Sequence, residues 1–320
     1  MKKRVKLLLL ATSLLTIISG CSNVGGKNVE DALSQNTSVD KETEIKDAES
    51  TVSTSVVKKD TPSSDIFNSE KISERTTRIF GKSGELMYLV EGTNKAVLID
   101  TGSGDGNLKE YVEKLTNKPV AVLITHGHID HASGASDFEE VYMNHADDLV
   151  YKEHVYDRLN GNAKPASDFK DLKEGDIFDL GGTTLEVYSA AGHTPGQMVI
   201  LFKEDRILLL GDAANTFTYL DKNSFSIEDY AKSMKELLAK TEGFYDTVYV
   251  SHGSGDAPKE VLAGVIEVCE ELLDGKAENM PYEFLGQQVL VAKRINAFFG
   301  RVDGGVGNIV YTMDKIPEAN

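Results

Sequence analysis

The sequence predicts a domain of packed α/β layers in which the sheets are mixed rather than purely parallel. Apolar runs of strand length recur between residues 86 and 250, and segments with helical periodicity lie between several of them. The dipeptides Gly181-Gly182 and Glu204-Asp205 each join two apolar runs through a connection short enough for a hairpin. The alternation indicates layers, and the hairpins indicate antiparallel pairs within the sheets.

Each expected element is recognised by its periodicity and by the residues at its ends. Apolar runs bounded by turn residues predict strands over 86–90, 96–99, 120–124, 141–143, 184–189, 198–202, 207–210 and 247–250. Helical spacing of apolar residues predicts helices over 108–115, 146–159, 227–240 and 259–273. Ser226 is the expected N-cap of the third helix, because Asp229 follows it three residues later.

Length and charge limit the classes of protein to consider. The chain has 320 residues, of which 40% are hydrophobic, so it can bury the core of one large domain or two small ones. Its formal net charge of -17 is incompatible with the broad basic surface that a phosphate backbone requires. We therefore expect no nucleic-acid partner, and the acidity is otherwise explained by solubility.

The N-terminus has the order of a bacterial export signal. Basic residues within 1–6 precede an apolar segment over 7–18, which is too short to span a bilayer as a stable helix. The following Ile18-Ser19-Gly20-Cys21 resembles the lipobox of bacterial lipoproteins, which implies cleavage before Cys21 and lipid on its thiol. An ordinary signal peptide or a membrane anchor is the alternative. We expect a protein held at the cell membrane by this lipid, facing away from the cytoplasm.

Composition divides the chain into three parts. Residues 1–20 are the expected signal peptide, and residues 21–65 are the lipidated cysteine and a disordered tether without aromatic residues. Residues 66–320 are the expected folded domain. Since Cys21 carries lipid in this interpretation, Cys269 has no partner for a disulfide within the chain. Its helical spacing in 261–273 predicts a buried structural thiol.

The most informative stretch is residues 125–131, which follow an apolar run. It contains His126, His128, Asp130 and His131. Imidazoles and a carboxylate at such short spacing are the ligands that zinc and similar divalent metals require. This motif predicts a metal site that needs further ligands from elsewhere in the chain.

Three further candidate ligands also follow apolar strands directly and lie beside glycine. They are His193, Asp212 and His252. Strand ends are positions from which a rigid sheet can direct polar groups into a shared cleft. The two remaining histidines, His145 and His154, are interpreted as ordinary surface or hydrogen-bonded residues.

With these motifs, the chain resembles the metallo-β-lactamase superfamily of hydrolases from about residue 79 to residue 253. The resemblance implies a four-layer αβ/βα sandwich and a dinuclear metal site. His126, His128 and His193 would hold the first metal, and Asp130, His131 and His252 the second. Asp212 would bridge both metals, and Asp100 would orient a ligand through a hydrogen bond.

The resemblance also implies the chemistry. Two divalent ions, zinc above iron or manganese, would activate a water against a small-molecule ester, thioester, lactone or phosphoester. Asp130 would in addition orient the nucleophile or transfer its proton. Residues 66–320 would then be a hydrolase domain tethered to the membrane. Two alternatives stay open: a catalytically idle metal-binding or solute-binding surface lipoprotein, and an iron-dependent redox enzyme of the same fold.

The branch of the superfamily is less defined. Asp212 resembles the glyoxalase II, lactonase and phosphodiesterase branches, because the β-lactamases have Cys or Ser at that position. Asn215 stands where the quorum-signal lactonases have Tyr. Six aromatic residues could line a substrate pocket, although core packing is the expectation. They are Phe217, Tyr219, Tyr282, Phe284, Phe298 and Phe299.

Overall fold

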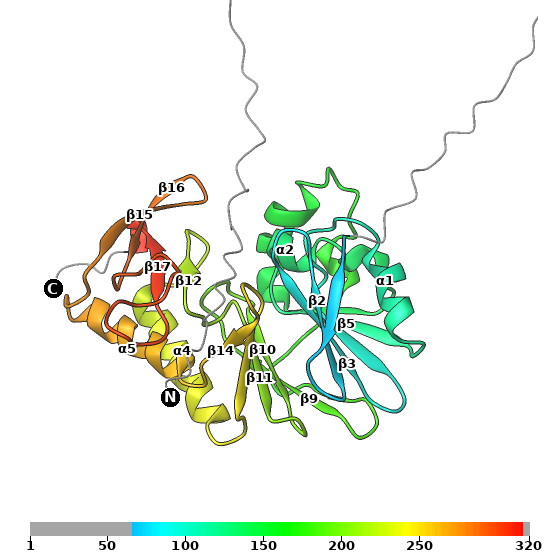
Figure 1. Ribbon diagram of the computed structural model, residues 1–320. Coiled ribbons are helices and arrows are strands. Elements are labelled where there is room, and N and C mark those ends of the chain that lie inside the picture. Colours follow the sequence, from blue (N-terminus) through cyan, green and yellow to red (C-terminus); the bar gives the residue numbers. More distant parts are fainter. Residues whose placement is uncertain (1–65, 316–320) are drawn as a thin grey trace, which may run out of the picture. The chain divides into compact units, whose positions relative to one another are not determined.

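The computed structural model describes residues 66–315, which form two large β-sheets, a small third sheet and the helices that cover them (Figure 1). The predicted signal peptide over 1–20, the tether over 21–65 and Cys21 lie outside the described residues. Within residues 66–315, no helix is both long enough and apolar enough to cross a bilayer.

Seven strands form the first large sheet: β1 (Asn68–Lys71), β2 (Thr76–Phe80), β3 (Leu86–Glu91), β4 (Ala96–Ile99), β5 (Val120–Ile124), β6 (Val141–Met143) and β7 (Lys170–Asp171). They lie in the sheet in the order in which they occur in the chain. The pairs from β1 to β4 are antiparallel, and those from β4 to β7 are parallel. Parallel pairing brings the carboxyl ends of β4 and β5 to the same edge.

Six strands form the second large sheet: β8 (Ile177–Asp179), β9 (Thr184–Ser189), β10 (Met198–Phe202), β11 (Ile207–Gly211), β13 (Thr247–Val250) and β14 (Asp256–Ala257). Their order is β14-β13-β11-β10-β9-β8. The predicted hairpins at Gly181-Gly182 and Glu204-Asp205 are confirmed, because β8 with β9 and β10 with β11 pair antiparallel. β11 and β13 pair parallel.

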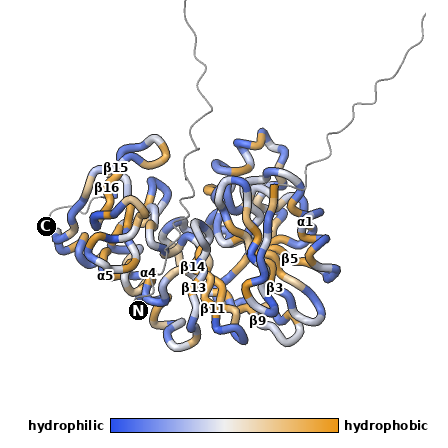
Figure 2. Tube along the Cα trace, in the orientation of Figure 1, coloured by the Kyte–Doolittle hydropathy of each residue, from blue (hydrophilic) through white to orange (hydrophobic). Residues whose placement is uncertain are grey.

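Alternate residues of the central strands enter different cores. In β3, Tyr88 and Val90 lie in the core between the two large sheets. Met87 and Leu89 lie in the core beneath helix α1 (Leu108–Leu115). This period of two is the signature of strands that are buried on both faces. In Figure 2 hydrophobic residues accordingly run along strands such as β3, β5 and β11.

The second sheet is covered on its outer face by helices α4 (Ile227–Thr241) and α5 (Val261–Leu273). From β10, Val199 and Leu201 face these helices, whereas Ile200 faces the first sheet. Ser226 caps α4 by accepting a hydrogen bond from the backbone N–H of Asp229, which confirms the predicted cap. The layers are therefore helix, sheet, sheet, helix, and the predicted four-layer sandwich is confirmed.

A small sheet follows the sandwich. Its strands are β12 (Thr218–Leu220), β17 (Ile309–Thr312), β16 (Gln287–Val291) and β15 (Met280–Phe284), in this spatial order. One face contributes Leu220, Ile309 and Tyr311 to the core around α4 and α5. The other face presents Val291 and Val310 with several aromatic side chains. The small sheet is thus fixed to the sandwich through one face.

The single helix predicted over 146–159 is wrong. This segment contains a 3-10 turn at His145–Asp147, the short helix α3 (Asp148–Tyr151) and a π-helical turn at Lys152–Tyr156. Apolar spacing could not reveal the change, because Val150, Tyr151 and Val155 are buried at positions that also fit an α-helix. A π-turn rotates the side chains that follow it, and such turns are frequent at functional sites.

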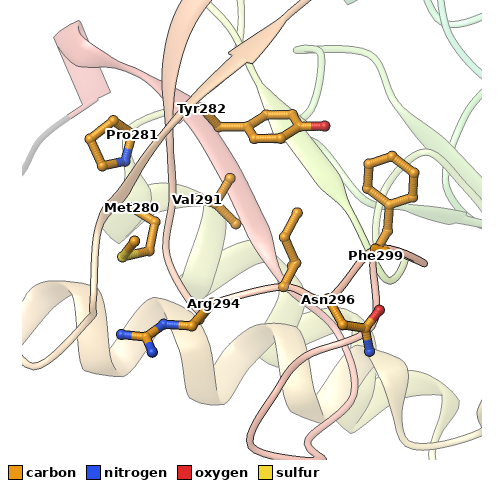
Figure 3. A pocket seen from close by; sticks show the side chains of 9 residues that line it. Met280, Pro281, Tyr282, Val291, Arg294, Asn296 and Phe299 are labelled. Atoms are coloured by element: carbon orange, nitrogen blue, oxygen red, sulfur yellow. The ribbon is translucent and has the colours of Figure 1, made fainter.

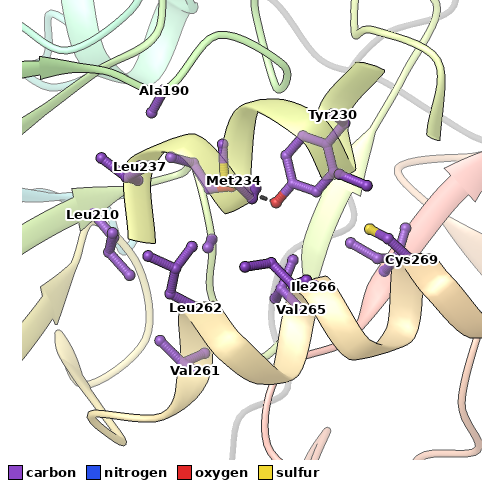
Figure 4. Close-up of a cluster of buried hydrophobic side chains, with 14 of the residues drawn as sticks. Ala190, Leu210, Tyr230, Met234, Leu237, Val261, Leu262, Val265, Ile266 and Cys269 are labelled. Carbon is purple, nitrogen blue, oxygen red and sulfur yellow. Dashed lines mark hydrogen bonds between the residues drawn. The ribbon is translucent and has the colours of Figure 1, made fainter. Parts of the chain in front are cut away.

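Cys269 supports a prediction about reactivity. It lies in α5 within the buried core shared with α4, near Tyr230 and Val265 (Figure 4). Burial raises the pKa of its thiol to about 12, so the reactive thiolate is scarce near neutral pH. In a Cys21→Ser chain, iodoacetamide at pH 8 should modify Cys269 at least about a hundredfold more slowly than in denaturant. Mass spectrometry would measure both rates, and equal rates would contradict the buried position.

Candidate metal centre

The structure brings together all seven residues that the sequence suggested as metal ligands. Most of them follow the carboxyl ends of strands of the two large sheets, and two lie on the short helix α2 (Ile129–Ala132). They are His126 and His128 after β5, Asp130 and His131 on α2, His193 after β9, Asp212 after β11 and His252 after β13. Their potential ligand atoms form three overlapping groups, within each of which no two atoms are more than 4.8 Å apart.

The first group consists of three imidazoles. The Nδ1 atom of His128 lies 3.1 Å from Nε2 of His126 and 3.1 Å from Nε2 of His193. Their ring planes are nearly perpendicular to one another, at 79° to 89° for the pairs that involve His128. Three nitrogen lone pairs that converge from different directions can hold a cation with tetrahedral preference.

The second group consists of Asp130, His131 and His252. Oδ2 of Asp130 lies 3.4 Å from Nε2 of His252 and 3.6 Å from Nε2 of His131. Asp212 lies between the two groups. Its Oδ2 atom is 3.1 Å from His252 Nε2, 3.6 Å from His131 Nε2 and 3.9 Å from His193 Nε2.

Hydrogen bonds on the far side of the rings orient the histidines. Nδ1 of His193 donates to the backbone carbonyl of Tyr219 at 2.7 Å, which leaves Nε2 with its lone pair free. Nδ1 of His131 lies 2.9 Å from Oδ2 of Asp100. Asp100 also accepts from the Thr125 hydroxyl at 2.8 Å, and this hydroxyl lies 3.1 Å from Nδ1 of His126. The buried carboxylate of Asp100 thus orients His131 directly and His126 through the hydroxyl of Thr125.

Two observations show that these residues fit a metal ion. First, Nε2 of His131 and Oδ1 of Asp212 are buried without a hydrogen-bond partner, although buried polar atoms are normally satisfied. Second, the atoms involved are imidazole nitrogens and carboxylate oxygens, which are ligands of zinc, iron and manganese. A cation at this position would satisfy both orphaned atoms.

The pKa shifts of the histidines show where the centre favours positive charge. Burial and the neighbouring histidines hold the pKa of His126 and His128 well below its ordinary value, so both rings are neutral lone-pair donors. Burial alone would lower the pKa of His131, but Asp130, Asp212 and Asp100 outweigh it and raise that pKa. Protons are therefore drawn to the carboxylate side of the centre, where a bound cation would replace them.

Asp147 is a buried carboxylate that was not among the candidate residues expected from the sequence. It accepts hydrogen bonds from the N–H of Gly127 at 2.8 Å, the N–H of Gly196 at 2.6 Å and the hydroxyl of Thr194 at 2.7 Å. These donors belong to the two loops that carry His126, His128 and His193. A Cβ atom at Gly196 would lie only 2.8 Å from Asp147 Cγ, so glycine is required for this approach. Asp147 therefore joins the two loops of the three-histidine group.

His154 lies beside the centre but is in none of the three candidate ligand groups, which agrees with its interpretation as an ordinary hydrogen-bonded histidine. The π-helical turn places its ring 4.6 Å from the ring of His128, between centroids, and its Nε2 3.3 Å from the amide of Asn223. His145 is ordinary as expected, because its Nδ1 pairs with Asp148 at 2.9 Å. The other candidate ligands were selected because they follow the end of a predicted strand. Asp147 follows β6 in the same way and could have been selected on that ground, whereas no feature of the sequence marks His154.

The Asp147 contacts predict a specific loss of stability. In an Asp147→Ala variant three buried donors lose their acceptor, so we expect the free energy of unfolding to fall by about 3 kcal/mol. Urea unfolding in the presence of a chelator would measure this loss without any contribution from metal. Asp148→Ala is the matched control, because the Asp148 side chain is 45% exposed and pairs only with His145 among the described residues. A loss below about 1 kcal/mol would show that Asp147 does not join the loops.

Comparison with known proteins agrees with this geometry. The family model for the metallo-beta-lactamase superfamily matches residues 81–252. A thioesterase of Pseudocercospora fijiensis that acts on atrochrysone carboxyl ACP is 25% identical over 196 residues, which cover 58% of this chain and 54% of that protein. The human acyl-coenzyme A thioesterase MBLAC2 is 26% identical over 200 residues, which cover 52% of this chain and 72% of that protein. The chain thus spans only about half the length of the first of these relatives.

Solved structures show the same fold. A metallo-β-lactamase from Pontibacter korlensis and the metallo-β-lactamase IND-7 each superpose with a TM-score of 0.52 at 21% identity, covering 64% of this chain and 99% of theirs. Since the family model covers more than half of the 320 residues, the chain belongs to the metallo-β-lactamase superfamily.

Proposed function

We propose that the protein is a metal-dependent hydrolase that cleaves a small ester, thioester, lactone or phosphoester at a centre for two metal ions. The position of Asp212 is the observation that carries this proposal. Its carboxylate lies within 3.9 Å of histidines from both groups, and one of its oxygens is buried without a partner. A carboxylate placed in this way can be shared by two cations.

The division of ligands follows from the groups. His126, His128 and His193 would hold one metal, and Asp130, His131 and His252 the other, with Asp212 common to both. When bound, the metals would make a water nucleophilic near neutral pH and polarise the bond to be cleaved. The native ion is expected to be zinc, with iron and manganese compatible with the same ligands.

The chain's own residues would position the reaction. The side chain of Asp130 is 33% exposed, compared with 13% for Asp212 and 1% for Asp100. Asp130 is therefore the carboxylate that a substrate and its attacking water can reach, and it would orient the nucleophile by accepting its hydrogen bond. Asp100 acts only through His131 and Thr125, because it is buried behind them.

A thioester is the favoured substrate class. Two relatives of the chain are named as thioesterases, which supports this type of reaction. Asn215 stands where the quorum-signal lactonases have Tyr, which argues against a lactone. Its Oδ1 accepts from the N–H of Phe217 at 2.6 Å, so the side chain holds a local turn.

We also propose that the hydrolase is held at the membrane by lipid on Cys21 and faces away from the cytoplasm. The basic segment, the apolar segment and the Ile18-Ser19-Gly20-Cys21 sequence support this location. The acidic, aromatic-free residues 22–65 would then be a tether between membrane and enzyme.

Loss of single ligands tests the function. His128→Ala and Asp212→Ala should lower the metal content of the purified chain and reduce kcat/KM by at least about a hundredfold. Elemental analysis and a panel of thioesters, esters, lactones and phosphodiesters would measure both. His145→Ala is the matched control, because His145 pairs with Asp148 away from the ligand groups. Full activity in metal-free protein would refute the proposal.

Two other outcomes would favour the alternatives. A metal-loaded chain without turnover would favour a catalytically idle metal-binding lipoprotein. Iron in protein purified without added metal would favour a redox enzyme.

The lipid anchor is tested separately. Cys21→Ser should move the protein from the membrane fraction to the soluble fraction and abolish incorporation of labelled palmitate. Fractionation and labelling in a bacterial host would measure both effects. Ser22→Ala is the control, because it changes the neighbouring hydroxyl and leaves the thiol intact. Palmitate on the Cys21→Ser chain would show that the anchor is elsewhere.

A further inference from the structure

The outer face of the small sheet carries a row of aromatic side chains that the centre itself does not use. We define the aromatic cluster as Phe217, Tyr219, Tyr282, Phe284 and Phe299. Phe217 lies with its ring centroid 6.0 Å from Tyr282, 5.2 Å from Phe284 and 5.3 Å from Phe299, and Tyr219 lies 5.1 Å from Phe284. All members of the cluster except Phe299 pack on Val289, Val291 and Val310.

The cluster begins beside His193, one of the candidate ligands. Tyr219 lies on the edge strand β12, and its backbone carbonyl accepts the hydrogen bond that orients His193. Its side chain belongs to the outer face of the sheet, whereas its neighbours Thr218 and Leu220 are buried on the other face. The residue that orients one candidate ligand is therefore also the first member of the aromatic surface.

The cluster ends at a hollow of about 410 Å³ on the far strands of the same face. Tyr282, Val291, Ile295 and Phe299 supply its apolar wall, and Arg294 and Asn296 lie at its polar rim (Figure 3). Because β15 and β16 are two to three strand spacings from β12, the hollow is roughly 10–14 Å from the edge near His193.

Phe299 is held at this position against its backbone preference. Its φ angle is 63°, in the left-handed region that bulky residues rarely adopt, and its side chain is 41% exposed. The ring nevertheless contacts Phe217 and also lines the hollow. Strained residues of this kind are frequent at ligand-binding sites.

We infer that the aromatic cluster and the hollow bind the acyl chain of the substrate. The enzyme would then prefer long unbranched acyl groups: at about 1.2 Å per bond, eight carbons reach the aromatic cluster and roughly ten or more reach the hollow. This inference rests on the proposed hydrolase function, because the cleaved bond must lie at the centre while the acyl chain extends over β12. An apolar chain suits the surface, since aromatic and aliphatic carbon lines most of it.

A chain-length series tests the inference in the full, metal-loaded protein. Acetyl, butanoyl, octanoyl and decanoyl thioesters of N-acetylcysteamine should show kcat/KM rising by about threefold per methylene between four and eight carbons. Phe299→Gly should reduce the ratio of the decanoyl value to the acetyl value by about tenfold. Glycine tolerates the positive φ angle, so this variant should fold normally. Phe298→Gly is the matched control, because the neighbouring ring is 90% exposed and outside the cluster.

Binding separates this inference from the proposed function. Decanoyl and acetyl amides of the same carrier, which resist hydrolysis, would be titrated calorimetrically into the wild-type chain and the Phe299→Gly variant. Tighter binding of the decanoyl amide, weakened by Phe299→Gly, would support the acyl surface even if no thioester is cleaved. Hydrolysis at rates independent of acyl length, or a decanoyl preference unaffected by Phe299→Gly, would overturn the inference and leave the hydrolase proposal standing.

Discussion

The concentration of carboxylates at one end of the sandwich is the constraint on which the rest of the site depends. Asp100, Asp130 and Asp212 all lie within 3.6 Å of a nitrogen of His131, and that imidazole is fully buried. Three carboxylates around one buried imidazole, two of them largely buried themselves, are costly unless positive charge is placed among them. Protons on His131 and His252 can supply some of this charge, and metal ions would supply more. The arrangement is therefore best understood as a preformed cation site.

The fold makes this concentration possible because it brings loops from two sheets to one edge. The N–H of Met198 in the second sheet donates to the carbonyl of Thr125 in the first at 2.8 Å, and Leu86 donates to Ser251 at 2.9 Å. These contacts fix the two sheets to each other beside the candidate ligands. Asp147 adds a third connection between loops. Rigid strands with short, hydrogen-bonded loops can hold ligand atoms within the tolerance that metal geometry demands.

Much of this arrangement was predictable from sequence, for physical reasons. Strands β4 and β5 are continuous apolar runs that end at polar residues, and β9 alternates buried Leu185 and Val187 with less buried residues. Their predicted limits agree with the structure. The candidate ligands could be selected because each follows such a strand. The sequence did not reveal the role of Asp147 or the proximity of His154 to His128, because both depend on contacts between distant parts of the chain. The small sheet was also hard to predict, since its strands mix polar and aromatic residues and pair β12 with β17 across about ninety residues. Cleavage at Cys21 and the tether stay predictions.

We propose that two metal ions share Asp212. Anomalous diffraction at the zinc absorption edge, from crystals of zinc-loaded protein, tests it most directly. We expect two peaks about 3.5–4 Å apart, with Asp212 in contact with both. One peak should lie beside His126, His128 and His193, and the other beside Asp130, His131 and His252. A single peak, or two peaks of which neither touches Asp212, would contradict it.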